Sequence, residues 1–508
     1  MALRKAVIGI DVGTSGTKAV LVDQFGHTVR DCMISYSFDV PVALWAEQDP
    51  SVWWDATVQA VSTLMHELEV ENDEIQVEGI SLTGQMHGLV CLDKHAMPIR
   101  KAILWCDLRS NDEARQLEAQ IGRQTVCALT QNPPLPNFTL TKLLWLKEHE
   151  PESFHRIATF LLPKDYIRFL MTGVLATEPT DASGTLLFDV EHRIWSKEMA
   201  RLSGIPLTWL PPVVESTALA GMITKEAGML LGVPEGTKVF AGAGDQAAGA
   251  LGIGVLQEGE LSVSLGTSGV VLAPTKAPVR DPDGALHTFC HVAPQSFYVM
   301  GVTQTAGGSL KWFRDRLRKG TSYDTIMSDA ASRPPGAEGL LFLPYLMGER
   351  SPLLDPLARG AWIGLQWQHT DADMARSLIE GVSFSLLDCL RRIEALRIDP
   401  WDVKLTGGGA DGPLWVQILG AVLKRSIRVL RGSQGPAYGA AVIAAIGAKL
   451  IQWDDVSKFV ADTDVTPAEY NPMWASAYES LFPLYQQAYR DLRKLYASID
   501  EWVSNKIT

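Results

Sequence analysis

The chain has 508 residues, of which 46% are hydrophobic and 20% are charged, and its formal net charge is -13. A chain of this length exceeds what one hydrophobic core supports, so two large domains are expected. The negative charge argues against a polyanion-binding surface, and nucleic acid is therefore not an expected partner.

The start of the chain and its apolar runs predict a soluble, cytoplasmic protein without a membrane partner. MALRKAVIGIDVG passes directly into a strand-like run and lacks the apolar region of a secretory signal. The longest apolar stretches, such as AYGAAVIAAIGA, are shorter than the roughly 20 residues that a membrane helix needs.

The six cysteines form no CxxC pair, which is typical of reduced thiols. HTFCH, residues 287–291, matches no common zinc spacing and alternates like a strand.

In chain order, AVIGIDVGTSGTKAVLVD predicts two strands joined by a Gly/Thr/Ser turn. A helix follows, which Asp49 can cap and which has Pro50 early in its first turn. The next buried strand, VEGISLTG, ends at the loop QMHG, residues 85–88.

The same order of elements recurs in the second half of the chain. ELSVSLGTSGVVLAP is another hairpin around Gly-Thr-Ser-Gly, and SFYVMGV, helical patterns and the strand VKLTGGG follow it. GTSG at 13–16 and at 266–269 is the clearest mark of this internal duplication. The duplication predicts two related α/β domains, 1–254 and 255–508.

DVGTSGTK, residues 11–18, is a glycine-rich turn without the GK[ST] element of a P-loop. Its glycines let the N–H groups face a phosphate, Thr14 and Ser15 can add hydroxyl donors, and Asp11 can hold hydrated Mg²⁺. A plain glycine-rich hairpin is the alternative. The second copy, which contains Thr267, favours two hairpins that clamp one triphosphate across a cleft.

LTGGGADGPLWVQILGAVL, which begins at residue 405, is predicted to form a strand, a triple-glycine turn and a helix. Gly407 and Gly408 have no side chains, so a flat ring could lie against their backbone. A tight turn between a strand and a helix would favour the same glycines. The sequence leaves both interpretations open.

VFAGAGDQAAGALGIG, residues 239–254, places one acid, Asp245, in a run of glycines and alanines. Its G-x-G-x-x-A pattern after a strand is that of a dinucleotide-binding loop. That loop would put Asp245 beside a pyrophosphate, and the later acids Glu258 and Glu260 precede a strand, whereas the fingerprint needs an acid at a strand end. The sequence therefore disfavours a dinucleotide site here.

Several segments occur in one order over nearly the whole chain: DVGTSGTKAVLVD, GQMHG, AILWCDLR, FTLTKLLWLKEHEP, LLPKDYIRFLMTG, DASGT, GDQAAGA, SLGTSG, FLPYLMGERSP and TGGGA. Together they resemble the FGGY carbohydrate kinases, and most of all the members that phosphorylate xylulose. The resemblance implies a two-domain, actin-like and ribonuclease-H-like α/β fold. It also implies MgATP in the interdomain cleft and a sugar held mostly by the N-terminal domain.

The resemblance implies roles for individual residues. Asp245 matches the family's proton acceptor, and Asp11 matches its essential acid near Mg²⁺ and phosphate. The implied sugar-binding residues are Gln85, Met86, His87, Trp105, Asp107 and Asp245. The implied nucleotide-binding residues are Gly13, Thr14, Ser15, Lys18, Gly266, Thr267, Gly407 and Gly408.

The chemistry of phosphoryl transfer also favours a general base at Asp245. Phosphoryl transfer to an alcohol needs a carboxylate within hydrogen-bond reach of the hydroxyl, because its proton becomes acidic only as the oxygen bonds to phosphorus. A helix that begins after Gly244 would offset the crowded negative charge with its N–H dipoles.

The sugar-site residues leave alternatives open. A lone loop histidine such as His87 is more often structural, and only the family pattern favours a sugar contact. Trp105 would add a stacking wall and Asp107 a polar anchor, but Asp107 and Arg109 could instead pair with each other.

Three positions depart from the family pattern: Cys106 and Gln246 stand where asparagine is common, and Asn137 stands where glycine is common. Cys106 leaves the sugar preference open.

The resemblance implies an ATP- and Mg²⁺-dependent kinase that converts D-xylulose to D-xylulose 5-phosphate, with a homodimer as one oligomeric state to test. Ribulose, glycerol and gluconate are the alternative acceptors. An actin-like ATPase switch is the alternative from another class. It would need both hairpins but not QMHG, ILWCDLR and GDQAA together.

Overall fold

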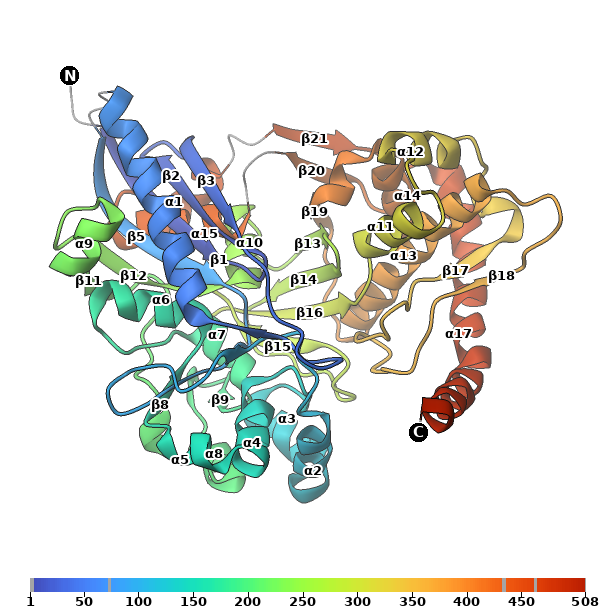
Figure 1. Cartoon of the computed structure of the whole chain (residues 1–508). Helices are drawn as coiled ribbons and strands as arrows, with labels where there is room; N and C mark the ends of the chain where they lie inside the picture. Colours follow the sequence, from blue (N-terminus) through green and yellow to red (C-terminus); the bar gives the residue numbers. More distant parts are fainter. Residues whose placement is uncertain (1–3, 72–74, 432–434, 461–463, 508) are drawn as a thin grey trace.

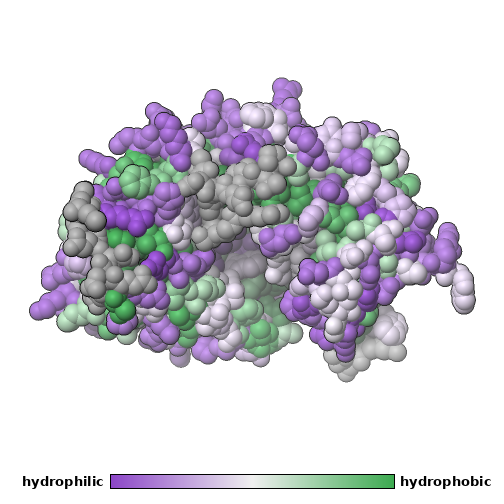
Figure 2. All heavy atoms as spheres, turned by 90° about the horizontal axis from the view of Figure 1, so that it is seen from above, coloured by the Kyte–Doolittle hydropathy of each residue, from purple (hydrophilic) through white to green (hydrophobic). Residues whose placement is uncertain are grey.

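The computed structural model describes residues 4–71, 75–431, 435–460 and 464–507. Two α/β units, each with a mixed sheet, lie side by side, with the first in blue to green and the second in yellow to red (Figure 1). Seen from above, the surface is mostly hydrophilic and is hollowed between the two halves (Figure 2). No helix among the described residues is both long and apolar enough to cross a membrane.

The first sheet has the strand order β11-β12-β5-β1-β2-β3. In that order, its strands are Leu219–Met222, Lys238–Gly244, Ile75–Gly84, Arg4–Val12, Gly16–Asp23 and Thr28–Ser35. The second sheet has the order β15-β16-β14-β13-β19-β20-β21. Its strands are His287–Cys290, Phe297–Thr303, Gly269–Thr275, Glu260–Leu265, Asp402–Thr406, Ile427–Arg431 and Asp464–Ala468.

The two sheets share one topology, which confirms the predicted duplication. β1 pairs with β2 in antiparallel and with β5 in parallel orientation, and β13 pairs in the same way with β14 and β19. The order β3-β2-β1-β5-β12 therefore corresponds to β16-β14-β13-β19-β20. The predicted class of two related α/β domains is confirmed.

Helices cover the sheets and fill the spaces around them. In the first half they are α1 Pro50–Glu71, α2 Asn111–Ile121, α3 Arg123–Thr130, α4 Thr139–His149, α5 Pro151–Arg156, α6 Pro163–Thr172, α7 Pro179–Ala182, α8 Lys197–Ser203, α9 Lys225–Leu231 and α10 Asp245–Gly252. In the second half they are α11 Gly307–Arg316, α12 Tyr323–Ala331, α13 Asp371–Ala395, α14 Pro413–Leu423, α15 Pro436–Gly447, α16 Val456–Phe459 and α17 Pro472–Ile507.

Short strands complete the loops between these elements. They are β4 Glu47–Gln48, β6 Val90–Leu92, β7 Ala102–Ile103, β8 Thr159–Leu161, β9 Phe188–Asp189, β10 Ile194–Trp195, β17 Leu341–Leu343 and β18 Ala361–Ile363. All six cysteines are free thiols, and HTFCH forms the buried strand β15 and its next residue.

One helix of the second half, α15, packs on the first sheet, where it appears in orange among the blue strands (Figure 1). A methyl group on Gly9 of β1 would lie 2.0 Å from the carbonyl oxygen of Ala437, so the strand and the helix meet backbone to backbone. Similarly, a methyl group on Gly439 would lie 1.8 Å from the carbonyl oxygen of Ala248 in α10. The division of the chain at residue 254 stays a prediction, and α15 joins the two halves.

Candidate active site

Strands β1, β5 and β12 end side by side at one edge of the first sheet. Val12 of β1 is paired with Gly84 of β5, and Gly84 is paired with Gly244 of β12, all in parallel register. The first hairpin, the loop that begins at Gln85 and the start of α10 therefore emerge together. The second sheet repeats this arrangement, because Ser264 beside the second hairpin is paired with Thr406 before the triple glycine.

The carbonyl groups of the first hairpin, residues 13–15, accept hydrogen bonds from neighbouring parts of the protein. The carbonyl oxygen of Gly13 accepts a hydrogen bond from the Tyr36 hydroxyl at 2.8 Å, that of Thr14 accepts one from Gln48 at 2.9 Å, and that of Ser15 accepts one from the Tyr36 N–H at 3.0 Å. In the described part of the chain, the N–H groups of Thr14 and Ser15 have no internal partner. These N–H groups are therefore available to an anion at the edge.

The Thr14 hydroxyl connects the hairpin to two other predicted segments. It accepts a hydrogen bond from Trp105 Nε1 at 2.9 Å and donates to Gln85 Oε1 at 3.2 Å. Gln85 is buried, and its amide nitrogen also faces Gln48 Oε1 at 3.3 Å. Gln85 and Trp105 thus brace the hairpin, and Thr14 makes both of these bonds through its one hydroxyl.

Asp11 and Asp245 come together at this edge. Asp11 is the last but one residue of β1, and its Oδ1 is shielded from solvent without a partner among the described residues. Burial and the nearby Asp245 raise the pKa of Asp11 to about 7, and Lys18 on the neighbouring strand opposes that rise. Lys18 also pairs with Asp31 at 3.0 Å.

Asp245 is the first residue of α10, as predicted, and Gly244 is the residue before that helix. Burial raises the pKa of Asp245 to about 6, although hydrogen bonds from Gln246 oppose the rise. The N–H of Gly244 donates to Thr180 Oγ1 at 2.8 Å, and Thr180 in turn donates to Glu178 at 2.9 Å. This buried chain of bonds fixes where the helix begins and therefore where Asp245 lies.

The glycines before Asp245 have a backbone explanation. Gly242 has φ +91°, and a methyl group on it would lie 1.9 Å from the carbonyl oxygen of Leu82. A change of register between β12 and β5 occurs at the same place. A methyl group on Gly244 would meet the Met86 side chain at 2.8 Å, so Met86 lies directly beside the beginning of α10.

His87 is buried, has φ +66° and presents one ring nitrogen to the protein. Its Nδ1 lies 2.8 Å from the carbonyl oxygen of Gly184, which can only accept a hydrogen bond. Burial lowers the pKa of His87 to about 3, so the ring is neutral and Nδ1 carries the proton. Nε2 is therefore a hydrogen-bond acceptor, which suits the hydroxyl donor of a polyol.

Lys142, which the sequence reasoning missed, holds the backbone of His87. Its Nζ is fully buried and donates to the carbonyl oxygens of His87 at 2.8 Å and Asn137 at 3.0 Å. Burial lowers the pKa of Lys142 to about 7. Its place in FTLTKLLWLKEHEP, a lysine directly before the apolar run Leu-Leu-Trp-Leu, was the available signal.

The Asp107 carboxylate points into the protein rather than toward the edge. It accepts hydrogen bonds from the N–H groups of Ala46 and Arg109 and pairs with the Arg109 guanidinium at 2.7 Å. Arg109 also pairs with Glu47 at 2.7 Å and lies 3.9 Å from the centre of the Trp45 ring. The structure thus contains the pairing of Asp107 with Arg109 that was the alternative to a sugar contact. Cys106 is half-buried beside them.

The second hairpin rests on the beginning of α11. The carbonyl oxygen of Gly266 accepts from Gly307 at 2.8 Å, and that of Thr267 accepts from Ala306 at 2.8 Å and Gly308 at 3.0 Å. A methyl group on Gly307 would lie 2.6 Å from the Gly266 oxygen. The GG pair before a helical pattern was the signal for this support, which the sequence reasoning did not use.

Gly407 and Gly408 of the triple glycine have different surroundings. Gly407 has φ +89°, and a methyl group there would lie 2.6 Å from the carbonyl oxygen of Leu265, so the turn itself needs glycine. At Gly408 a methyl group would meet nothing within 4 Å. The tight turn explains Gly407, whereas Gly408 leaves the backbone open to a flat ring.

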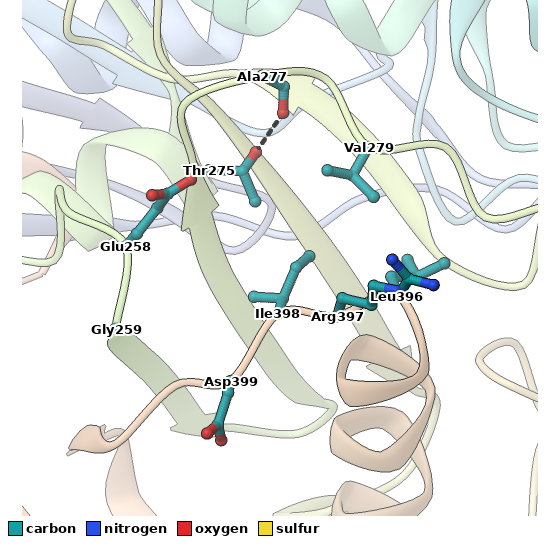
Figure 3. A pocket seen from close by; sticks show the side chains of 9 residues that line it. All are labelled: Glu258, Gly259, Thr275, Ala277, Val279, Leu396, Arg397, Ile398 and Asp399. Atoms are coloured by element: carbon teal, nitrogen blue, oxygen red, sulfur yellow. Dashed lines mark hydrogen bonds between the residues drawn. The ribbon is translucent and has the colours of Figure 1, made fainter.

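A pocket of about 330 Å³ lies elsewhere in the second half (Figure 3). Glu258, Gly259 and Asp399 are among its lining residues. Gly259 directly precedes β13, whose other end carries the second hairpin, so this pocket is at the opposite end of the strand from the candidate site.

The donors at the edge fit a nucleotide with its magnesium ion. Asp11 supplies a shielded carboxylate oxygen that no other described residue contacts by a hydrogen bond, and Mg²⁺ prefers ligands of this kind. The N–H groups of Thr14 and Ser15, which have no partner among the described residues, suit phosphate oxygens.

Comparison with known proteins identifies the class. Residues 6–252 match the N-terminal domain of the FGGY family of carbohydrate kinases, and residues 261–448 match its C-terminal domain. The chain belongs to the FGGY family of carbohydrate kinases.

Individual relatives cover nearly the whole chain. The chain is 37% identical to a xylulose kinase of Staphylococcus xylosus over 495 residues, which are 97% of this chain and 99% of that protein. A ligand-bound xylulose kinase from Lactobacillus acidophilus superposes with a TM-score of 0.92 at 28% identity, covering 97% of this chain and 100% of that one. A gluconate kinase from the same organism also has a TM-score of 0.92 at 28% identity, with 98% and 100% covered.

Proposed function

We propose that the protein transfers the γ-phosphoryl group of MgATP to O5 of D-xylulose, with Asp245 as the general base. The observation that carries the proposal is the position of Asp245: it follows Gly244, which lies against Met86, and it is close to Asp11 at the edge where the first hairpin emerges. The identity of 37% to a xylulose kinase over 97% of the chain supports D-xylulose as the acceptor.

The residues divide the reaction between them. Asp245 accepts the proton of the sugar hydroxyl while the oxygen forms its bond to the γ-phosphorus and the bond from that phosphorus to the bridging oxygen of ADP breaks. A carboxylate with a pKa of about 6 is ionised at neutral pH and still basic enough to take this proton. Asp11 would hold Mg²⁺, which supplies neutralisation of phosphate charge when bound.

The two halves hold different parts of the nucleotide in this proposal. The N–H groups of the first hairpin and of the Gly266-Thr267 turn bind the phosphate chain, and the adenine lies against Gly408. Met86 and the Nε2 acceptor of His87 form the wall of the sugar site. Gln85 and Trp105 hold the first hairpin in place through their hydrogen bonds with the Thr14 hydroxyl. Asp107 pairs with the buried Arg109 and contributes to the stability of the fold in this proposal.

Gluconate is the second candidate acceptor, because a gluconate kinase has an equally similar fold. An acceptor panel separates it from D-xylulose.

Substitution of Asp245 by asparagine tests the base. We expect Asp245→Asn to lower kcat for sugar phosphorylation by roughly 10²- to 10⁴-fold, the usual effect of a positioned general base, while ATP affinity stays within about threefold. Asp55→Asn, on the exposed face of α1, is the matched control and should behave as wild type. A turnover within a few-fold of wild type in Asp245→Asn would remove Asp245 from this role.

A further inference from the structure

Arg350, in the loop after β17, is a cation with free hydrogen-bond donors close to the sugar wall. Its Nη2 donates to His287 Nε2 at 3.0 Å, and its Nε is shielded from solvent without a partner among the described residues. Burial lowers the pKa of Arg350 to about 10, which keeps the guanidinium charged at neutral pH. The described residues offer it no carboxylate as an ion-pair partner.

The neighbouring acid, Glu349, accepts its hydrogen bonds from Thr303 and from backbone N–H groups rather than from the Arg350 guanidinium, and its charge supports the protonated form of Arg350. The buried Glu349 carboxylate accepts hydrogen bonds from Thr303 Oγ1 at 2.6 Å and from the N–H groups of Gln304 and Arg350, both at 2.8 Å. These bonds attach the loop to the end of β16. The backbone of Arg350 is therefore fixed, while the Nε–H of its guanidinium has no acceptor among the described residues.

His287 orients the guanidinium and adds no negative charge. Burial and the charge of Arg350 lower the pKa of His287 well below its usual range, so its ring is neutral. Because Arg350 can only donate, His287 Nε2 must accept and Nδ1 carries the proton. The Nδ1 atom is buried without a partner among the described residues.

A continuous row of side chains leads from the catalytic edge to Arg350. Met86 lies against Gly244, and the ring of His87, the next residue, is 4.8 Å from the ring of Phe138. Phe138 in turn is 5.6 Å from the ring of His287, which accepts from Arg350. The charge of Arg350 also contributes to the low pKa of His87. This row crosses from the first half of the chain to the second.

We propose that Arg350 binds the acceptor sugar, donating to the oxygens of its C1–C2 end while Asp245 takes the proton from the hydroxyl at the other end. The inference rests on the proposed function and adds a residue of the C-terminal half to the sugar site. A guanidinium has five N–H donors and no acceptor, so it suits a ketose carbonyl better than the hydroxyl group of the corresponding alditol. The contact makes sugar binding depend on both halves of the protein.

Calorimetric binding of D-xylulose without nucleotide tests the inference independently of turnover. We expect Arg350→Gln to raise the Kd for D-xylulose at least tenfold, with the Kd for a non-hydrolysable ATP analogue within twofold of wild type. The wild-type preference for D-xylulose over D-arabinitol, in which a hydroxyl replaces the carbonyl, should shrink in the same variant. Arg391→Gln, on the exposed face of α13, is the matched control.

Two further arms keep the result interpretable. Arg350→Lys retains the positive charge but loses the planar set of guanidinium N–H donors, so it should weaken D-xylulose binding by less than Arg350→Gln does. The lysine variant also tests the role of Arg350 if the glutamine variant does not fold. If the wild-type protein binds another acceptor more tightly, D-xylulose is the wrong substrate and the same variants are measured with that acceptor. An acceptor Kd within twofold of wild type in a folded Arg350→Gln protein would overturn the role of Arg350, as would an equal loss of sugar and nucleotide binding.

Discussion

The carboxylates of Asp11 and Asp245 lie close enough together that the charge of Asp245 raises the pKa of Asp11. Both acids are at the edge where β1, β5 and β12 end, and burial raises the pKa of each. The nucleotide-free protein therefore holds two negative charges in a poorly solvated place. A bound cation would relieve this repulsion, and protonation would relieve it in the absence of one.

The rate should fall at acid pH because Asp245 must be ionised to act as the base. With a pKa of about 6 in the free enzyme, Asp245 loses its basic form as the pH falls through that value. We expect kcat/KM for the acceptor to decline tenfold per pH unit well below pH 6, measured at saturating MgATP. His87 should not contribute a second limb between pH 6 and 8, because its pKa is about 3. A profile that is flat down to pH 5 would contradict this assignment.

Removing the charge of Asp11 should stabilise the nucleotide-free protein. The pKa of Asp11 is about 7 in the fold and 3.8 as the ordinary value, so the folded state binds the extra proton and the free energy of unfolding falls as the pH rises from about 4 to 7. We therefore expect Asp11→Asn to melt at a higher temperature than wild type at pH 8, with a smaller difference at pH 5. Activity should be lost in the same variant. A lower melting temperature at pH 8 would show that Asp11 supports the fold.

The ring of His87 should matter for the acceptor and not for the nucleotide. Asparagine tolerates the left-handed backbone of this position, so His87→Asn removes the Nε2 acceptor with little backbone strain. Loss of one hydrogen bond corresponds to about tenfold, and we expect the KM for D-xylulose to rise by about that factor while the KM for ATP stays unchanged. His95→Asn, in an exposed turn, is the control. An unchanged KM for the acceptor would assign His87 a purely structural role.

Asp107 should contribute to stability rather than to sugar binding. Removing one partner of a buried ion pair costs about 3 to 5 kcal/mol, and Asp107→Ala would leave the buried Arg109 with Glu47 as its remaining acid. We expect a loss of about 3 kcal/mol in urea unfolding and, in folded protein, a KM for D-xylulose within about twofold of wild type. A normal unfolding curve together with a large rise in that KM would instead make Asp107 a sugar anchor.

Much of the fold could be predicted because its signals are local. The repeated Gly-Thr-Ser-Gly turn, each between two strand patterns, was enough to predict two related α/β units. The position of α15 could not be predicted in this way. Its small apolar residues favour a buried helix, but only the close contact of Gly9 with Ala437 shows that its partner is the first sheet.

In the candidate site too, local sequence patterns predicted some features, whereas contacts between distant parts of the chain could not be predicted. Asp11, Asp245 and the glycine turns follow predicted strands, so their common edge could be anticipated from the duplication. The hydrogen bond from the N–H of Ala46 to the Asp107 carboxylate spans 61 residues, and the bond from Lys142 to the carbonyl oxygen of His87 spans 55 residues. Arg350 reaches His287 across 63 residues. No local pattern specifies such contacts, because the packing of whole loops creates them.

The central claim is tested most directly by kcat/KM of the wild-type protein for D-xylulose against D-ribulose, L-ribulose, L-xylulose, glycerol and D-gluconate, at saturating MgATP. We expect D-xylulose to give the highest value and its 5-phosphate as the product. A site built to bind the hydroxyls of a ketopentose should strongly reject a shorter acceptor that leaves its polar groups without partners. Another acceptor preferred by tenfold or more, or no phosphorylation of D-xylulose at all, would contradict the assignment.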